Sequence, residues 1–152
     1  MAGRALAMSS KLSAIAVQTF KVPPQRVYDA ILDPDVIARF MFGPLLREEI
    51  ILHIDNEPRV GGVFSYKVQR GDDVIDHVGE FLELDPPRRI SFTWGIASES
   101  DGDPSVVAID IAPTPDGCRL TLTQEIPQEW AAYVDQSRAA WEKMLGVLVT
   151  LL

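Results

Sequence analysis

The chain has 152 residues, of which 47% are hydrophobic and 24% are charged, the size and composition of one ordinary globular domain. Fourteen basic residues against 22 acidic ones give a net charge of −8, which removes the electrostatic attraction on which nucleic-acid and anionic-membrane binding depend. No apolar run approaches the roughly 20 residues that cross a bilayer, and the single cysteine allows no internal disulfide, so we expect a cytoplasmic protein without membrane insertion.

Residues 1–10 are expected to form a flexible tail, because two serines and a lysine interrupt the early apolar stretch and make it a poor secretory signal. The segment that follows, KLSAIAVQTFKV, is rich in β-forming residues and stops at Pro23-Pro24, which cannot donate hydrogen bonds to a sheet. We therefore predict a single domain over residues 11–152 that begins with a strand.

Two short helices are predicted after this strand. Pro24 suits the first turn of PQRVYDAILD, and the apolar residues of that segment fall on one face. Asp33 and Pro34 then supply an N-cap and a first-turn proline for DPDVIARFMF, which ends at Gly43.

From residue 47 to residue 125 the sequence alternates β-rich runs with turn residues, as an antiparallel meander does. In VFSYKV and RISFTW the large side chains share one face, and VVAIDIA and CRLTLTQE follow loops that contain Asp101-Gly102 and Asp116-Gly117. Pro86-Pro87 and the two arginines after them predict a solvated hairpin corner, and a bulge is expected near Gly79. We therefore predict an antiparallel sheet of six or seven strands.

The last segment, PQEWAAYVDQSRAAWEKMLGVLVTLL, predicts an amphipathic helix. Its apolar stripe recurs at three- and four-residue steps from Trp130 to Leu152, over about 35 Å at ~1.5 Å per residue. A stripe this long must be buried, so we expect the helix to lie across one face of the sheet.

Several motifs carry a resemblance to a known family. They are Asp33-Pro34, Gly43-Pro44, Pro58 with Gly61-Gly62, GEFLELDPPRRISFTW at 79–94, GCRLTLTQE at 117–125, and Trp141. With the order of elements, they resemble the α+β helix-grip fold of the START-like, or SRPBCC, superfamily, in which a curved antiparallel sheet surrounds a long C-terminal helix. The closest resemblance, from about Thr19 to the C-terminus, is to the Aha-type domain family named after activators of the Hsp90 ATPase.

The resemblance implies an apolar cavity between the sheet and the C-terminal helix. The family's usual tryptophans in the second short helix are replaced here by Phe40, Met41 and Phe42, a departure that would reshape a pocket entrance. The residues expected to line the cavity are Phe40, Phe42, Phe64, Tyr66, His77, Trp94, Tyr133, Trp141 and Met144. The alternative is that these large side chains fill the core completely.

Other reactive side chains give weaker signals. The two histidines, His53 and His77, lie in no cluster with metal-ligand spacing, so no metal or other cofactor is expected, and His77 is better explained as a structural histidine than as an acid or base. The acidic side chains Asp76, Glu80 and Glu83 are expected to be solvated charges at a sheet edge. Cys118 has little to stabilise a thiolate, and Gly61-Gly62 lacks the spacing of a phosphate loop.

The leading functional hypothesis is a binding protein that encloses a small apolar or amphipathic molecule. One alternative, from the family's name, is a partner-binding module that stimulates a chaperone ATPase. Another is an enzyme, such as a cyclase, aromatase or hydrolase, with Tyr66, His77 and Glu80 as candidate polar groups. Catalytic residues stay unassigned, and a homodimer is as acceptable as a monomer.

Overall fold

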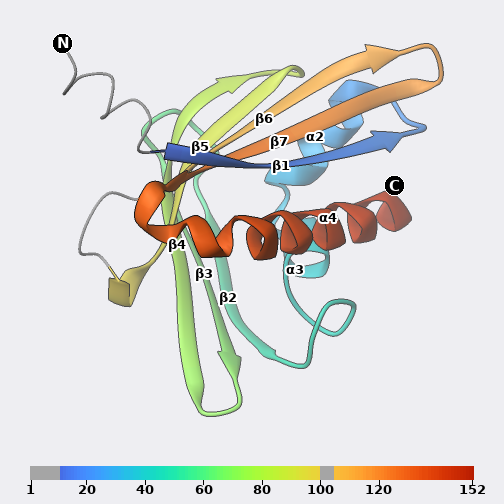
Figure 1. The fold of residues 1–152 in the computed structure, drawn as a ribbon. Helices are drawn as coiled ribbons and strands as arrows, with labels where there is room; N and C mark the ends of the chain where they lie inside the picture. The colour runs from blue at the N-terminus through green and yellow to red at the C-terminus, as the bar shows by residue number, and fades with distance from the viewer. Residues whose placement is uncertain (1–10, 100–104) are drawn as a thin grey trace, which may run out of the picture.

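A curved antiparallel sheet forms the main layer of the computed structural model, which describes residues 11–99 and 105–152 (Figure 1). Its seven strands within these ranges are β1 (Lys11–Phe20), β2 (Ile50–Asn56), β3 (Val63–Arg70), β4 (Asp73–Asp85), β5 (Arg89–Ile96), β6 (Ser105–Thr114) and β7 (Gly117–Pro127). They lie in the order β1-β7-β6-β5-β4-β3-β2, so the meander from β2 to β7 is completed by β1 at its far edge. The predicted α+β helix-grip fold is thereby confirmed.

Two short helices follow β1, as predicted. They are α2 (Pro24–Leu32) and α3 (Pro34–Phe40), and the amide of Asp35 donates to the Asp33 side chain at 2.9 Å, which caps α3. The second helix ends at Phe40, three residues before the glycine expected to end it, and Gly43 adopts φ +87° in the loop beyond. This left-handed turn redirects the chain toward β2.

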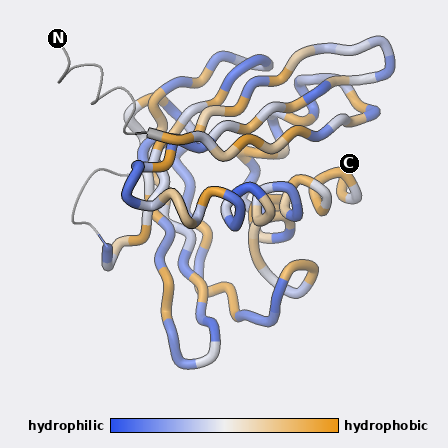
Figure 2. Tube along the Cα trace, viewed as in Figure 1, coloured by the Kyte–Doolittle hydropathy of each residue, from blue (hydrophilic) through white to orange (hydrophobic). Residues whose placement is uncertain are grey.

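Side chains alternate across the strands as the sequence pattern predicts. In β3, Phe64, Tyr66 and Val68 are buried, whereas the residues between them are more exposed; in β7, Leu120 and Leu122 point into the core. Figure 2 shows the same alternation of hydrophobic and hydrophilic positions along the strands. The buried set faces the helices, because residues two apart share one face of a sheet.

The C-terminal helix α4 (Val134–Leu151) crosses the concave side of the sheet, alongside β1 and against α3 (Figure 1). The helix is shorter than predicted: Gln128–Tyr133 form a 3₁₀ segment, η2, with non-helical φ/ψ at Trp130. The chain turns here from β7 toward the helix axis, so Trp130 stays half-exposed and the buried stripe begins only at Trp141. The 18 residues of α4 span about 27 Å.

The irregularity expected near Gly79, within GEFL at 79–82, is present at the end of that stretch. The register with β5 shifts between Phe81 and Glu83, which leaves Leu82 as the extra residue of a bulge. Gly79 is regular in register, and it is required for another reason: a Cβ atom there would overlap the Thr93 carbonyl oxygen and the Phe64 ring. The neighbouring strand and an aromatic side chain therefore approach the backbone closely at Gly79.

The Pro86-Pro87 corner joins β4 to β5, as predicted, and its arginines form ion pairs. Arg88 contacts Asp85 at 2.9 Å, while Arg89 contacts Glu83 at 2.8 Å and Asp110 at 2.7 Å, which links β4, β5 and β6. The Asp101-Gly102 loop lies outside the described residues.

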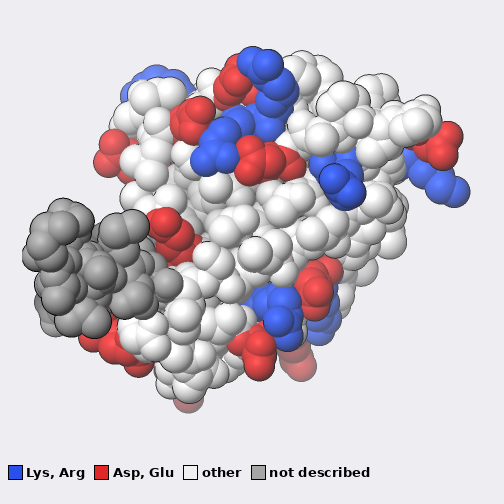
Figure 3. Space-filling view, turned by 45° about the horizontal axis from the view of Figure 1, so that its top comes forward, with Lys and Arg blue, Asp and Glu red and all other residues white. Residues whose placement is uncertain are grey.

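The surface charges are mixed in sign. On the face in Figure 3, groups of basic side chains lie beside groups of acidic ones, with uncharged surface between them. Across residues 11–99 and 105–152, none of the helices has the length and apolar character needed to cross a bilayer.

Candidate functional site

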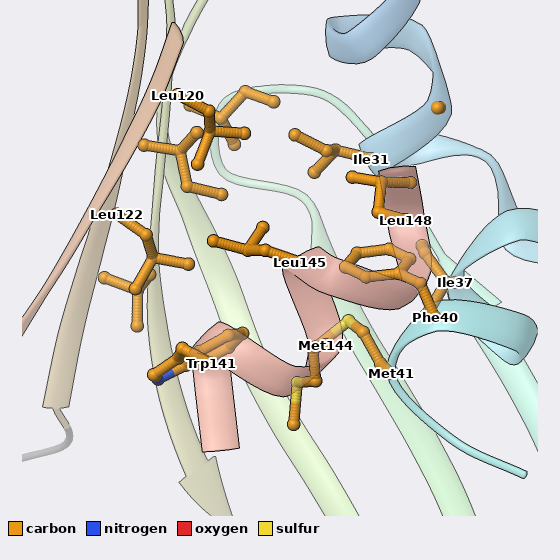
Figure 4. Close-up of a cluster of buried hydrophobic side chains, with 14 of the residues drawn as sticks. Ile31, Ile37, Phe40, Met41, Leu120, Leu122, Trp141, Met144, Leu145 and Leu148 are labelled. Atoms are coloured by element: carbon orange, nitrogen blue, oxygen red, sulfur yellow. The ribbon is translucent and has the colours of Figure 1, made fainter. Parts of the chain in front are cut away.

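An inner pocket lies between the concave face of the sheet and the three α-helices. It is lined by Ile31, Leu32, Phe40, Met41, Phe64, Tyr66, Phe81, Ile90, Phe92, Trp94, Ile109, Leu122, Trp141 and Leu145. Half of these side chains are aromatic, and none carries a charge at neutral pH. In Figure 4, Leu145 extends from α4 toward Leu122 on the sheet, and Phe40 of α3 lies on the other side.

The inner pocket is small in this closed conformation. The space in it that can hold the centre of a water-sized sphere is only about 20 Å³. That is room for roughly one water molecule. The aromatic side chains thus fill most of the space that the sequence led us to expect as a deep cavity.

One wall of the pocket is a continuous array of rings. Phe64 stacks on Tyr66 with 4.6 Å between ring centroids and meets Phe92 edge-on at 5.6 Å. Trp94 continues the array and lies 5.5 Å from Trp141, which joins the sheet to α4. These distances are typical of favourable aromatic pairs, so the wall is a continuous apolar surface of tilted and stacked rings.

Two polar groups of this wall, on Tyr66 and Trp141, already have hydrogen-bond partners. The Tyr66 hydroxyl donates to Asn56 Oδ1 at 2.7 Å, and Trp141 Nε1 donates to Gln124 Oε1 at 2.8 Å. Burial raises the pKa of Tyr66, which keeps the phenol protonated. In the described part of the chain, no buried side-chain nitrogen or oxygen lacks a hydrogen-bond partner.

Five of the nine predicted lining residues are in the wall: Phe40, Phe64, Tyr66, Trp94 and Trp141. Phe42 and Met144 are buried outside the pocket lining. Tyr133 lies outside the pocket lining, in η2, where it is 49% exposed and its ring centroid is 5.5 Å from that of Trp130. The reason is the turn before α4, which moves this part of the stripe off the sheet.

His77 is also outside the pocket lining, in a structural setting. Its Nδ1 donates to the Tyr66 carbonyl oxygen at 3.1 Å, and its ring packs 5.0 Å from Phe42 and 5.4 Å from Trp94. Burial lowers the pKa of His77, so the ring is neutral at pH 7. This environment agrees with a hydrogen-bonded core histidine.

The pocket residues that the sequence analysis missed follow two patterns. Most are apolar side chains on inward faces of strands or on α2 and α4, namely Ile31, Phe81, Ile90, Phe92, Ile109, Leu122 and Leu145. Strand alternation and helix spacing could have found them. Leu32 and Met41 stand at the ends of α2 and α3, where helical periodicity gives no signal.

The other candidate side chains do not form a catalytic arrangement. Asp76 accepts from Ser65 Oγ at 2.6 Å, and Glu83 pairs with Arg89, so both have structural partners. Their strand, β4, lies inside the sheet between β3 and β5, which corrects the expectation of an edge strand. Glu80 is exposed, away from the buried Tyr66 and His77.

Cys118 is fully buried at the start of β7, and burial raises its pKa, which disfavours a thiolate. Among the described residues, no three His, Cys, Asp or Glu side chains come together in a way that could hold a metal ion.

Comparisons with solved structures show the same fold. Protein CV1439 from Chromobacterium violaceum is 25% identical, with a TM-score of 0.73, and the match covers 95% of this chain and 97% of that one. An AHSA1-like protein from Aeromonas hydrophila is 22% identical, with a TM-score of 0.73 and coverage of 91% and 90%. A protein of unknown function, SA2116 from Staphylococcus aureus, is 19% identical, with a TM-score of 0.75 and coverage of 92% and 94%.

No curated protein matches the chain significantly in sequence. One family model does match, over residues 21–152, which is most of the chain. The chain therefore belongs to the family described as activator of Hsp90 ATPase homolog 1-like proteins.

Proposed function

We propose that this protein binds a small, uncharged, largely aromatic or aliphatic molecule in the inner pocket. The observation that carries the proposal is the chemistry of the pocket wall: fourteen side chains without a formal charge, half of them aromatic, with the polar atoms of Tyr66 and Trp141 already in hydrogen bonds. Pockets of this kind retain apolar molecules through buried area and ring contacts.

The same wall disfavours an anionic ligand such as a fatty acid. A carboxylate moved from water into the pocket would lose its hydration, and no Lys, Arg or His stands in the lining to pair with it. Burying an unpaired charge costs several kcal/mol, more than one ring contact returns. The proposal therefore covers neutral molecules and excludes acids.

Binding requires the wall to open, because the closed pocket has room for roughly one water. Met41 and Leu145 are flexible aliphatic side chains in the wall, so they are the residues we expect to move, while the packed rings stay in place. We expect small ligands of one to three rings rather than long lipid chains.

A matched pair of probes tests this proposal. N-phenyl-1-naphthylamine is neutral, and 1-anilinonaphthalene-8-sulfonate has the same aromatic skeleton with an added negative charge. Two of the three tryptophans line the pocket, and the third, Trp130, is exposed. In the W130F variant all tryptophan fluorescence comes from the pocket wall, so energy transfer from tryptophan to the probe reports binding in the pocket. We expect the neutral probe to bind at least tenfold more tightly than the anion.

Pocket location is tested with two variants of α4. Leu145→Phe adds a ring inside the pocket and should abolish binding of the neutral probe, whereas Val149→Phe, one turn further on at an exposed position, should leave it unchanged. Urea unfolding confirms that both variants fold. Equal affinity for the two probes, or binding that survives Leu145→Phe, would contradict the proposal.

The family description also names activation of a chaperone ATPase. Purified Hsp90 and its ATPase rate, measured with and without this chain, provide the competing assay. Stimulation in the absence of any probe binding would replace ligand binding with a partner-binding function.

A further inference from the structure

A second hollow, the outer groove, lies on the surface next to the inner pocket. It has a volume of about 480 Å³ and is lined by Tyr28, Asp29, Leu32, Asp33, Pro58, Leu84 and Pro86. These residues come from α2, the joint between α2 and α3, the turn after β2, and the corner between β4 and β5. The outer groove is wide enough for an organic molecule, whereas the inner pocket is closed.

Leu32 separates the two hollows. Of the described residues, it is the one that lines both the outer groove and the inner pocket. Its side chain is partly buried, at the last position of α2, and the next residue, Asp33, has the extended conformation that joins α2 to α3. A small change at this joint would move Leu32 without unwinding either helix.

A hydrogen-bond relay fixes the backbone at Leu32. Asn56 Nδ2 donates to the Leu32 carbonyl oxygen at 2.9 Å, which satisfies one of the unpaired carbonyls at the end of α2. Asn56 Oδ1 in turn accepts from the Tyr66 hydroxyl at 2.7 Å, and Tyr66 belongs to the pocket wall. The relay thus connects the wall that a ligand would touch with the residue that closes the pocket.

We infer that ligands enter the inner pocket from the outer groove past Leu32, and that Asn56 is the latch that keeps this gate closed. The inference rests on the proposed function and adds the route by which a ligand enters and the residues that control its entry. Opening of this gate requires loss of the bond between Asn56 and Leu32 and movement of the Leu32 side chain, after which Met41 and Leu145 move to widen the inner pocket. A ligand that reaches the Tyr66 hydroxyl competes with Asn56 and favours opening.

The charge of the outer groove agrees with a neutral ligand. Its rim carries Asp29 and Asp33, and no Lys or Arg is among its lining residues. Burial and the negative charges of Asp85 and Asp29 raise the pKa of Tyr28 in the groove floor. Anions are therefore disfavoured at the entrance as well as inside the inner pocket.

The rates of probe binding test the gate. Asn56→Asp still accepts from Tyr66 but can no longer donate to Leu32. Stopped-flow measurements with N-phenyl-1-naphthylamine should show association and dissociation rate constants that both rise at least fivefold, with Kd unchanged within twofold. The reason is that the bond from Asn56 to Leu32 is present in the closed form with or without ligand and is broken only during opening, so its loss lowers the barrier in both directions and leaves the difference between the free and bound states unchanged. Because the probe is neutral, the added negative charge does not repel the probe, and its repulsion of the Leu32 carbonyl oxygen acts in the same direction as loss of the bond.

Further variants keep the test decisive. Leu32→Trp should slow both rates by blocking the passage, and Leu32→Ala should increase both rates by widening it. These two variants test the gate even if Asn56→Asp fails to fold. Leu52→Ala is the matched control, because Leu52 is an exposed leucine that lines neither hollow, and it should change neither rate.

The outcomes separate the two proposals. Binding with unchanged rates in the Asn56 and Leu32 variants overturns the gate and leaves the binding function in place. A change confined to the dissociation rate also overturns the gate, because it would mean that these residues contact the bound ligand without controlling its entry. Absence of probe binding in every variant overturns the binding function and, with it, the gate.

Discussion

At the scale of single residues, Glu49 has the most demanding environment among the described carboxylates. Its side chain has no exposed surface, yet it accepts from Arg70 Nε at 2.6 Å, from Arg47 Nη1 at 3.0 Å and from the Gly43 amide at 2.7 Å. Burial by itself raises the pKa of Glu49, but the hydrogen bonds from Arg70 and Gly43 and the charges of both arginines outweigh it, so the pKa lies below its ordinary value. The Glu49 carboxylate therefore links β3 to the loop after α3, and this loop carries Met41 of the pocket wall.

Replacing this carboxylate should destabilise the protein in a pH-dependent way. We expect Glu49→Gln to cost roughly 1–3 kcal/mol of unfolding free energy at pH 7, because hydrogen bonds to a buried charge are lost. A folded-state pKa below the unfolded value near 4.5 stabilises the fold above that value, and the stabilisation is lost as the pH falls through the folded pKa. The difference between wild type and variant, measured by urea unfolding, should therefore be constant from pH 8 to about 5 and shrink below about 4.

Glu83→Gln is the control for this measurement. Its ion pair with Arg89 is partly exposed on both sides, so the expected loss is below about 1 kcal/mol. A difference between wild type and Glu49→Gln that stays constant down to pH 3 would show that the charge of Glu49 does not stabilise the fold.

At the scale of elements, the sheet shows why two glycines in paired strands are not equivalent. Val78 pairs with Gly95 across β4 and β5, and Gly79 is the next residue along β4. A Cβ atom at Gly79 would overlap Thr93 of β5 and Phe64 of β3, whereas a Cβ atom at Gly95 would meet nothing within 4 Å. Gly79 therefore lets Phe64, the centre of the ring array, lie flat on β4.

Alanine at the two positions should have different effects. Gly79→Ala must displace a backbone carbonyl or the Phe64 ring, so we expect a loss of about 1–3 kcal/mol and weaker binding of the neutral probe. Gly95→Ala should be neutral or slightly stabilising, because glycine in a strand has an entropic cost that alanine relieves. Urea unfolding of both variants measures the effect, and equal stability would mean that Phe64 moves aside without cost.

At the scale of the whole molecule, β1 completes the sheet and supports α4. All ten of its residues pair with β7, and Ala14, Ala16 and Phe20 are buried. The region matched by the family model begins at residue 21, after this strand. The folding unit is therefore longer than the matched region, because without β1 the helix would lose the strand along which it packs.

Two truncations test this folding unit. A chain of residues 11–152 should unfold at the same urea concentration as the full chain. A chain of residues 21–152 would expose the edge of β7 and the apolar face beside α4, so we expect it to unfold or aggregate, as circular dichroism and size-exclusion chromatography would show. A stable, monomeric chain of residues 21–152 would contradict the structural role of β1.

Local chemistry let the sequence alone predict most of the architecture. Asp33 and Pro34 mark the start of α3, the two prolines at 86 and 87 mark a corner, and strand alternation identifies Phe64, Tyr66 and Trp94 as members of one face. Each of these signals depends on neighbours within a few residues, so no tertiary information is needed to interpret them. The motifs quoted from the sequence were also sufficient to predict the family.

Only the tertiary structure decided what the interior can hold. Periodicity places Tyr133 on the same stripe as Trp141, but the turn of the chain between β7 and α4 removes it from the sheet. Whether the rings leave a wide cavity depends on packing distances among several strands and α4, and these have no local signature. The position of Leu32 between two hollows likewise depends on how α2, β2 and β4 meet. These segments are far apart in the sequence and come together only on folding, so no local pattern predicts the position.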